Sequence, residues 1–349
     1  ALDDSARRPF GEPQGRDVYW FVGGPLDGRV HTREPADPAP AEDAPAARAR
    51  SRRGAGSPEA MVEGMGDGDG WAGCGLGHTH WGRFGAAGLL PYHRDSDGQV
   101  WVLLQQRAWW GIGGGTWGMF GGALHSHEDP VTGALRETSE ECTLDTGAVK
   151  VHGTSVEDHG GWAFTSVVGS LSELPPVRPA SRETRRAEWV RAEDVTRRKL
   201  FEPFARSWPR LREAMKGVTL VVDAANVVGS RADGWWKDRA GANARLRDEL
   251  KALSGGVEGV PGGLVRFDRC FPEVVLVVEG AARAVAEAPS NGVRVVAAPG
   301  SGDDQIVELV RGGGPDTAHL VVTADRELRR RCEAAGAAVT GPSWLLERL

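Results

Sequence analysis

The sequence predicts an α/β protein with two consecutive domains behind a poorly ordered N-terminal region. The chain has 349 residues, which is about twice the size of an ordinary domain. From about Phe84, strand-like runs flank one long acidic helix. From Gly217, short apolar runs alternate with helical segments. Hydrophobic residues make up 40% of the chain, which is enough for ordinary globular cores.

Residues 1–70 are predicted to be mostly disordered. The stretch from Glu34 to Glu63 is rich in Ala, Pro, Arg and Gly and has almost no large apolar side chains. Such a segment buries too little apolar surface to offset the entropy of ordering. Ahead of it, the run from Asp17 to Val30 has the composition of a small hairpin.

The first domain is expected over residues 71–216. The runs 86–92 and 100–104 flank a turn at Asp95–Gly98 and therefore predict a β-hairpin. A glycine-rich loop follows, and then a helix from about Glu128 to Cys142. Further strands are expected at 162–171 and 187–190, and an amphipathic helix at 204–215.

The second domain is expected over residues 217–349. Its strands and helices alternate, which implies right-handed crossovers and a Rossmann-like parallel sheet. The predicted strands are 218–222, 274–278, 293–296, 320–323 and 338–339, and the predicted helices are 240–253, 303–311 and 326–335.

Composition narrows the classes of function. The net charge of −6 argues against a nucleic-acid footprint over the whole chain. The chain has four cysteines, and no two of them form a Cys-x-x-Cys pair. Four widely spaced cysteines in a chain of this length do not form a disulfide framework, so we expect a reducing cytoplasm. No apolar run approaches about 18 residues and no signal peptide is evident, so we expect a cytoplasmic protein without a membrane partner.

Three potential zinc ligands cluster near the start of the first domain: Cys74, His78 and His80. No second pair of ligands follows at a suitable spacing. The sequence therefore does not favour a structural zinc site.

The acidic helix carries the most informative spacing. Gly122 is followed after five residues by Glu128, and after seven more by Arg136. Glu137, Glu140 and Glu141 then share one helical face. Carboxylates at this spacing repel one another, and a hard divalent ion such as Mg²⁺ or Mn²⁺ removes that penalty. The same ions bind phosphate oxygens, so the arrangement suits attack of water on a phosphoanhydride.

These residues match the Nudix box, Gx5Ex7REUxEExGU in one-letter code, where U is a bulky aliphatic residue. The resemblance covers about residues 78–215 and implies a Nudix α/β/α sandwich with a mixed sheet. It also implies hydrolysis of the diphosphate bond in a nucleoside triphosphate or a nucleoside-diphosphate-linked substrate. The alternative interpretation is an ordinary helix with a solvated, charged face, because such charge runs are common. We favour the Nudix box because Gly122 and Glu128 stand at the spacing from the helix that the box requires.

The resemblance implies a metal site and a catalytic set. Glu137, Glu140 and Glu141 would ligate Mg²⁺ or Mn²⁺, with the backbone carbonyl of Gly122 as a further ligand. Glu183 is a candidate for the late glutamate that some members use as a base or an extra ligand.

Other matched residues would orient the site or contact substrate. Glu128 would pair with Arg136 and brace the loop against the helix. Arg107 and Trp117 are candidates for substrate binding.

The box is not perfect. It calls for glycine where Thr143 stands, and a left-handed conformation there would cost a non-glycine residue about 1–2 kcal/mol. Thr138 also replaces an aliphatic residue. Because every ligand is kept, we expect a functional enzyme. The alternative is a non-catalytic nucleotide sensor that regulates the C-terminal domain.

In the second domain, acidic residues stand where predicted strands end. The carboxyl ends of parallel strands converge on one crevice, and several carboxylates there would require a metal, as in two-metal phosphodiester chemistry. These residues are Asp223, Glu279, Asp303, Asp304 and Asp325.

The second domain resembles the PIN-like nucleases, in particular the NYN branch, over about residues 217–349. The matching segments are Val221–Val228, Gly302–Ile306 and Val322–Arg326. The resemblance implies RNA as a partner, with Asn226 positioning the first loop and a metal set of Asp223, Asp303, Asp304 and Asp325. The alternative is a plain Rossmann-like domain whose aspartates cap helices.

Overall fold

The structure, a computed structural model, describes residues 66–232, 234–287 and 292–349. The predictions for residues 1–65, including the hairpin at 17–30, lie outside the described residues. Residues 66–70, predicted to be disordered, are instead packed against the first domain. Gly68 is buried, and its carbonyl accepts a hydrogen bond of 2.8 Å from the backbone of Arg83. Backbone hydrogen bonds, rather than apolar burial, hold this segment.

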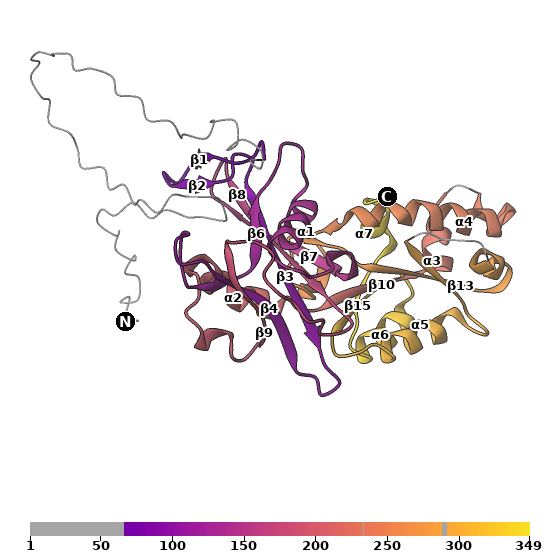
Figure 1. The fold of residues 1–349 in the computed structure, drawn as a ribbon. Helices are drawn as coiled ribbons and strands as arrows, with labels where there is room; N and C mark the ends of the chain where they lie inside the picture. Colours follow the sequence, from indigo (N-terminus) through magenta and orange to yellow (C-terminus); the bar gives the residue numbers. More distant parts are fainter. Residues whose placement is uncertain (1–65, 233, 288–291) are drawn as a thin grey trace, which may run out of the picture.

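The first half is a mixed-sheet α/β unit, as the sequence predicts (Figure 1). Its third strand pairs antiparallel with the fourth and sixth strands and parallel with the eighth. The strands are β1 (Trp71–Gly73), β2 (Thr79–Trp81), β3 (Ala86–Arg94), β4 (Val100–Arg107), β5 (Trp117–Gly118), β6 (Phe120–Ala123), β7 (Lys150–Asp158), β8 (Ala163–Ser170) and β9 (Thr184–Arg191), and the helices are α1 (Pro130–Glu141) and α2 (Glu202–Glu213).

Strand β3 shows why the sheet lies between two helices. Successive side chains of a strand point to opposite faces. Leu89 packs in the cluster that contains Ala134 of α1, whereas Leu90 packs in the cluster that contains Trp208 and Leu211 of α2. The two helices therefore cover opposite faces, which confirms the predicted α/β/α arrangement.

The second half is a parallel five-stranded sheet in the order β14-β13-β10-β15-β16. The predicted elements are confirmed, with small shifts at their ends. The five strands of this sheet are β10 (Gly217–Asp223), β13 (Glu273–Val278), β14 (Val293–Ala297), β15 (Thr317–Val322) and β16 (Ala338–Thr340). The second half also contains two short strands outside this sheet, β11 (Val257–Glu258) and β12 (Arg269–Cys270). Its helices are α3 (Ala224–Gly229), α4 (Arg239–Leu250), α5 (Gly302–Arg311), α6 (Arg326–Ala334) and α7 (Pro342–Leu346).

Strand β10 is the centre of this second sheet. Leu220 packs in one core cluster with Leu246 of α4, and its neighbour Val221 packs in another with Ile306 of α5 and Leu328 of α6. Helices α3 and α4 therefore lie on one face and α5 and α6 on the other (Figure 1).

The two halves are joined by a hairpin that was not predicted. Strands β11 and β12 come from the second half, but β12 pairs antiparallel with β7 of the first sheet. Ion pairs between Arg94 and Asp316, and between Lys150 and Glu273 at 3.1 Å, lie across the same junction. Strands of two residues carry too short a pattern to be recognised in the sequence.

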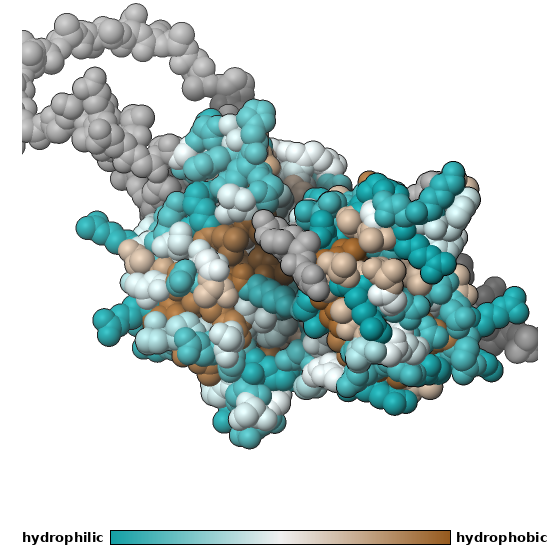
Figure 2. Space-filling model, turned by 90° about the vertical axis from the view of Figure 1, so that its right-hand side faces the viewer, coloured by the Kyte–Doolittle hydropathy of each residue, from teal (hydrophilic) through white to brown (hydrophobic). Residues whose placement is uncertain are grey.

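The surface seen in Figure 2 is mostly hydrophilic, and apolar side chains gather in one hollow of that face. Within the described ranges, every helix is too short or too polar to cross a lipid bilayer.

Leu211 provides a test of the packing between α2 and the sheet. Its side chain is 1% exposed, so Leu211→Ala should lower the free energy of unfolding by about 2–5 kcal/mol. The neighbouring Arg212 is exposed, and Arg212→Ala should stay within about 0.5 kcal/mol. Urea unfolding of the full chain, followed by tryptophan fluorescence, measures both. Equal effects of the two substitutions would contradict this packing.

Candidate active site

The loop before α1 is tied to the helix by a forked ion pair. The Arg136 guanidinium donates to both Glu128 oxygens at 2.9 and 3.0 Å, and also to the Ala123 carbonyl at 2.9 Å. One Glu128 oxygen also accepts from the backbone of His125. The hydrogen bonds from Arg136 lower the pKa of Glu128. The loop is thereby held in one position against the helix.

The helix begins where the sequence provides a cap. Asp129 accepts hydrogen bonds from the backbones of Val131 and Thr132 at 3.0 and 3.1 Å. Pro130 occupies the first turn, where its missing N–H costs nothing. The predicted helix therefore starts two residues later than Glu128, which stays in the loop to meet Arg136.

Glu141 is the most deeply buried carboxylate of the box, at 6% exposure. One of its oxygens accepts hydrogen bonds of 3.0 Å from the Gln105 side chain and from the Gly121 backbone. Burial raises the pKa of Glu141 to about 8, and the nearby charge of Arg107 only partly opposes this. Gln105 was not singled out from the sequence, because a glutamine on a strand gives no signal of its partner 36 positions away.

Glu137 lies directly against the backbone of β6. A side chain at Gly122 would collide with the Glu137 carboxylate, so the box requires glycine there for close approach. Burial raises the pKa of Glu137 to about 7, opposed by Arg136, which donates to it at 2.8 Å. Glu140 and Asp69 raise that pKa further. Glu140 itself is exposed and lies 3.4 Å from Arg136.

Two further carboxylates lie close to this group. Burial raises the pKa of Glu183, Arg107 opposes the rise, and the charge of Asp69 adds to it. Arg107 is also close enough to Glu141 for their charges to interact. The structure thus brings Glu183 to the box, and it adds Asp69. Asp69 was missed because its Gly-Asp-rich segment has no apolar residues and was assigned to the tail.

The carboxylates of this site suit a divalent cation. Five carboxylates lie in this region, but only two guanidinium groups, those of Arg107 and Arg136, are near them. The carboxylates are those of Asp69, Glu137, Glu140, Glu141 and Glu183. Burial already disfavours the anionic form of three of these carboxylates, Glu137, Glu141 and Glu183. A hard cation with oxygen ligands would relieve both the burial and the repulsion.

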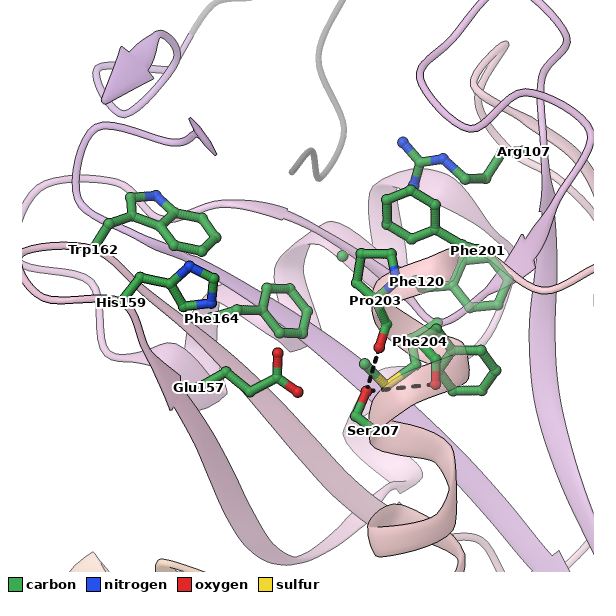
Figure 3. A pocket seen from close by; sticks show the side chains of 12 residues that line it. Arg107, Phe120, Glu157, His159, Trp162, Phe164, Phe201, Pro203, Phe204 and Ser207 are labelled. Carbon is green, nitrogen blue, oxygen red and sulfur yellow. Dashed lines mark hydrogen bonds between the residues drawn. The ribbon is translucent and has the colours of Figure 1, made fainter. Parts of the chain in front are cut away.

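A small aromatic pocket opens beside Arg107 and Gly121, both of which adjoin Glu141 (Figure 3). Trp162 and Phe164 lie on one side, and Phe201 and Phe204 lie on the other. Arg107 lies at the pocket edge, with its guanidinium 5.1 Å from the Phe201 ring centre. Arg107 therefore lies next to both the pocket and Glu141, and its role in substrate binding stays a prediction.

The prediction that Trp117 contacts substrate has to be corrected. Its side chain is 6% exposed and belongs to the core cluster that includes Phe204 and Trp208. The guanidinium of Arg198 lies 4.0 Å from the ring centre. Because β5 places this indole in the core between sheet and helix, Trp117 is a packing residue.

The expected strain at Thr143 is absent. The helix ends with Cys142 in an extended conformation, at φ −148° and ψ 168°, and in the described residues His127 alone among non-glycines has a positive φ. Thr143 instead exchanges hydrogen bonds with the backbone of Arg178, at 2.9 and 3.0 Å. The chain after β8 thereby replaces the usual glycine cap.

In the second half, Asp223 ends β10 and is firmly held. It accepts hydrogen bonds from Thr323 at 2.8 Å and from the backbone and side chain of Asn226 at 3.1 and 2.9 Å. Asn226 in turn accepts a hydrogen bond from the backbone of Ala324. It therefore links the ends of β10 and β15, and its orienting role stays a prediction.

The other acidic residues of this edge divide into two groups. Burial raises the pKa of Asp303, and the charges of Asp223, Asp325 and Glu279 raise it further, so Asp303 lies near each of these three carboxylates. Asp304 was placed in the same metal set, but its exposed side chain forms an ion pair of 2.5 Å with an arginine of α6. The structure therefore places Glu279, rather than Asp304, with the other carboxylates.

The first half of the chain matches a known protein family. Residues 83–211 match the family model described as NUDIX domain. A relative from Mycobacterium tuberculosis, named "Putative 8-oxo-dGTP diphosphatase 3", is 44% identical over 161 residues, which is 44% of this chain and 74% of that protein. The chain belongs to the Nudix family. Residues 83–211 are its Nudix hydrolase domain.

Two other relatives share the same region. A Bifidobacterium longum protein, "Nucleoside triphosphate pyrophosphatase/Nudix hydrolase fusion protein", is 42% identical over 147 residues, which is 41% of this chain and 30% of that protein. A crystal structure of a Nudix hydrolase from M. smegmatis is 39% identical, covers 42% of this chain and 94% of that chain, and has a TM-score of 0.39. The family model ends at residue 211, and the PIN-like resemblance of the second half stays a prediction.

The raised pKa values of Glu137 and Glu141 predict pH-dependent metal binding. Both carboxyls hold a proton below about 7 and about 8 respectively, and a cation must displace these protons. Affinity for Mn²⁺ should therefore fall as the pH is lowered from about 9 to about 6, by up to tenfold per pH unit for each proton displaced. Calorimetric titration measures this, and Glu141→Gln should reduce the slope. An affinity that is constant over this range would contradict the prediction.

Proposed function

We propose that the first domain, residues 71–216, is a divalent-metal-dependent hydrolase that cleaves a diphosphate bond in nucleoside triphosphates, with an oxidised purine nucleotide as its substrate. The observation that carries this is the pair of carboxylates held against the backbone of β6, of which Glu141 is buried and Glu137 is partly buried. The named activity of the M. tuberculosis relative supports the choice of nucleotide.

Some residues of the site would hold the metal ion, and others keep those residues in place. When bound, Mg²⁺ or Mn²⁺ would neutralise the carboxylates and polarise phosphate oxygens. Glu137, Glu140 and Glu141 would hold it, with the Gly122 carbonyl as a further ligand. The Arg136–Glu128 pair keeps these ligands and the loop in register.

The aromatic pocket suits the base of the nucleotide. Phe164, Phe201 and Trp162 offer planar apolar surfaces, and Glu157 offers a carboxylate that can accept hydrogen bonds from the base (Figure 3). Arg107, between pocket and carboxylates, would meet the phosphates. Glu183 is suited to accept a proton from the attacking water, because its raised pKa brings it closer to neutral pH.

The alternative function is a nucleotide sensor that binds without turnover. It rested on the departure from the box at Thr143. The extended helix end and the bonds between Thr143 and Arg178 remove the expected strain. The structure therefore favours the enzyme.

Substitution of one of the proposed metal-binding glutamates should strongly reduce turnover while leaving the fold intact. Glu140 is exposed, so Glu140→Gln should not unfold the domain, and it should lower kcat/KM for 8-oxo-dGTP by about 10²–10³-fold. Release of pyrophosphate in the presence of Mg²⁺ measures the rate. Glu173→Gln, in the exposed segment after β8, is the matched control and should keep full activity. Nucleotide binding without hydrolysis by the unmodified protein would favour the sensor.

We also propose that the C-terminal half is a metal-dependent ribonuclease. Its support is the group formed by Asp223, Asp303, Asp325 and Glu279 at the carboxyl edge of the parallel sheet. Carboxylates gathered in this way suit two-metal cleavage of phosphodiesters.

Substitution at the sheet edge tests the ribonuclease proposal. Asp223→Asn keeps the shape of the side chain but removes its charge, and it should reduce Mn²⁺-dependent cleavage of single-stranded RNA by about 10²-fold or more. Asp248→Asn, in an exposed surface ion pair on α4, should have no effect. Gel analysis of end-labelled RNA gives both rates. The absence of cleavage by the unmodified full chain would refute the proposal without affecting the hydrolase.

A further inference from the structure

Four metal-binding side chains meet at the edge of the first domain, away from the glutamates of the box. They are Cys74, His78, His80 and His159, and one ligand atom of each lies within 4.8 Å of the others. Cys74 and His78 bound the turn between β1 and β2, and His80 belongs to β2. His159 follows β7, 79 positions after His80. The sequence showed three ligands, and the fold supplies the fourth.

Two turns carry these ligands, one between β1 and β2 and the other after β7. The backbone N–H of Cys74 donates a hydrogen bond of 2.9 Å to the His78 carbonyl and closes the first turn. Gly75 donates to the Gly160 carbonyl at 2.6 Å and joins it to the turn after β7. Both segments that carry ligands are therefore held in contact by their own backbones.

The imidazoles pack against one another, with His80 buried and His78 and His159 partly buried. His80 is fully buried, and its ring stacks on Trp162 with ring centres 3.9 Å apart. The rings of His78 and His159 lie 6.1 Å apart, and that of His159 lies 4.8 Å from His80. The Nδ1 atom of His78 is buried and has no hydrogen-bond partner. A buried polar atom without a partner costs free energy, and a metal ion would supply its missing interaction.

The donor set selects the kind of metal. One thiolate and three imidazoles form the nitrogen–sulfur set that zinc prefers, whereas Mg²⁺ and Ca²⁺ prefer oxygen. A tetrahedral zinc site separates its ligand atoms by roughly 3.3–3.7 Å. The group needs to contract by about one ångström to reach that geometry, which small rotations of the side chains can provide.

We propose that Cys74, His78, His80 and His159 bind one structural zinc ion. Strands β1 and β2 have three residues each, and an isolated two-stranded hairpin of this size is not stable. Trp81 of β2 is buried and packs edge-on against Trp71 of β1, but in the described part of the chain the hydrophobic core clusters include no side chain from residues 66–81. The zinc ion stabilises this hairpin by fixing it to the turn after β7.

The position of the hairpin connects the zinc site to the rest of the domain. Asp69, whose charge acts on Glu137 and Glu183, lies two residues before β1. His159 and Trp162 line the aromatic pocket (Figure 3). The zinc ion therefore fixes one wall of the pocket and the segment that carries Asp69.

Metal analysis of the full chain tests the site. Protein purified without chelators and washed with excess Mg²⁺, which clears the carboxylate site, should retain about one equivalent of zinc by mass spectrometry. Cys74→Ser and His159→Gln should lose it, and His159→Cys should keep it because cysteine is also a zinc ligand. His127→Asn is the matched control, because its φ of 65° suits asparagine, and its zinc content should be unchanged.

A measurement on the unmodified protein guards against variants that fail to fold. Replacement of zinc by Co²⁺ should produce the absorption bands of tetrahedral cobalt together with a thiolate-to-cobalt band, which requires Cys74. A protein that neither retains zinc nor binds added Zn²⁺ or Co²⁺ would overturn the proposal. So would a zinc content that is the same in Cys74→Ser as in the unmodified chain.

Discussion

The active site depends on keeping several carboxylates close together in a partly buried place. Glu141 and Glu137 are pressed against β6, and burial raises the pKa of both. Such an arrangement is unfavourable for the apoprotein unless positive charge is near. Arg136 and Arg107 supply part of that charge, and a divalent cation would supply the rest. The expected affinity for metal and the electrostatic repulsion among these carboxylates therefore have the same origin.

Arg136 connects three elements of this site through hydrogen bonds. Its guanidinium bonds Glu128 in the loop, the Ala123 carbonyl at the end of β6 and Glu137 on its own helix. A loop, a strand and a helix are thereby fixed relative to one another by one planar donor group. Lysine could not replace it, because a single ammonium lacks the rigid fork that these acceptors require.

The two halves of the chain form a continuous structure rather than two separate bodies. Strand β12 of the second half adds to the first sheet through β7, and ion pairs such as Lys150–Glu273 lie across the junction. The Nudix glutamates and the edge that carries Asp223 belong to different sheets. Each site is therefore assembled within its own half, while the hairpin holds the halves together.

Local patterns in the sequence were sufficient for most of the longer helices and strands, although not for β7 (Lys150–Asp158), and for the acidic face of α1. Helical periodicity places Glu137, Glu140 and Glu141 on one face, and the spacing from Gly122 to Glu128 identifies the loop. Alternating strands and helices indicate the parallel sheet. These features depend on residues that are near one another in the chain, so periodicity and spacing reveal them.

The tertiary structure alone decided the partners that come from distant segments. Gln105 meets Glu141, Asp69 approaches Glu183, and His159 joins Cys74, because strand register and loop packing bring these residues together. The same applies to Trp117, which is buried by the helix that packs over it. No local pattern encodes such contacts, since each depends on where a separate part of the chain comes to lie once the sheets have formed.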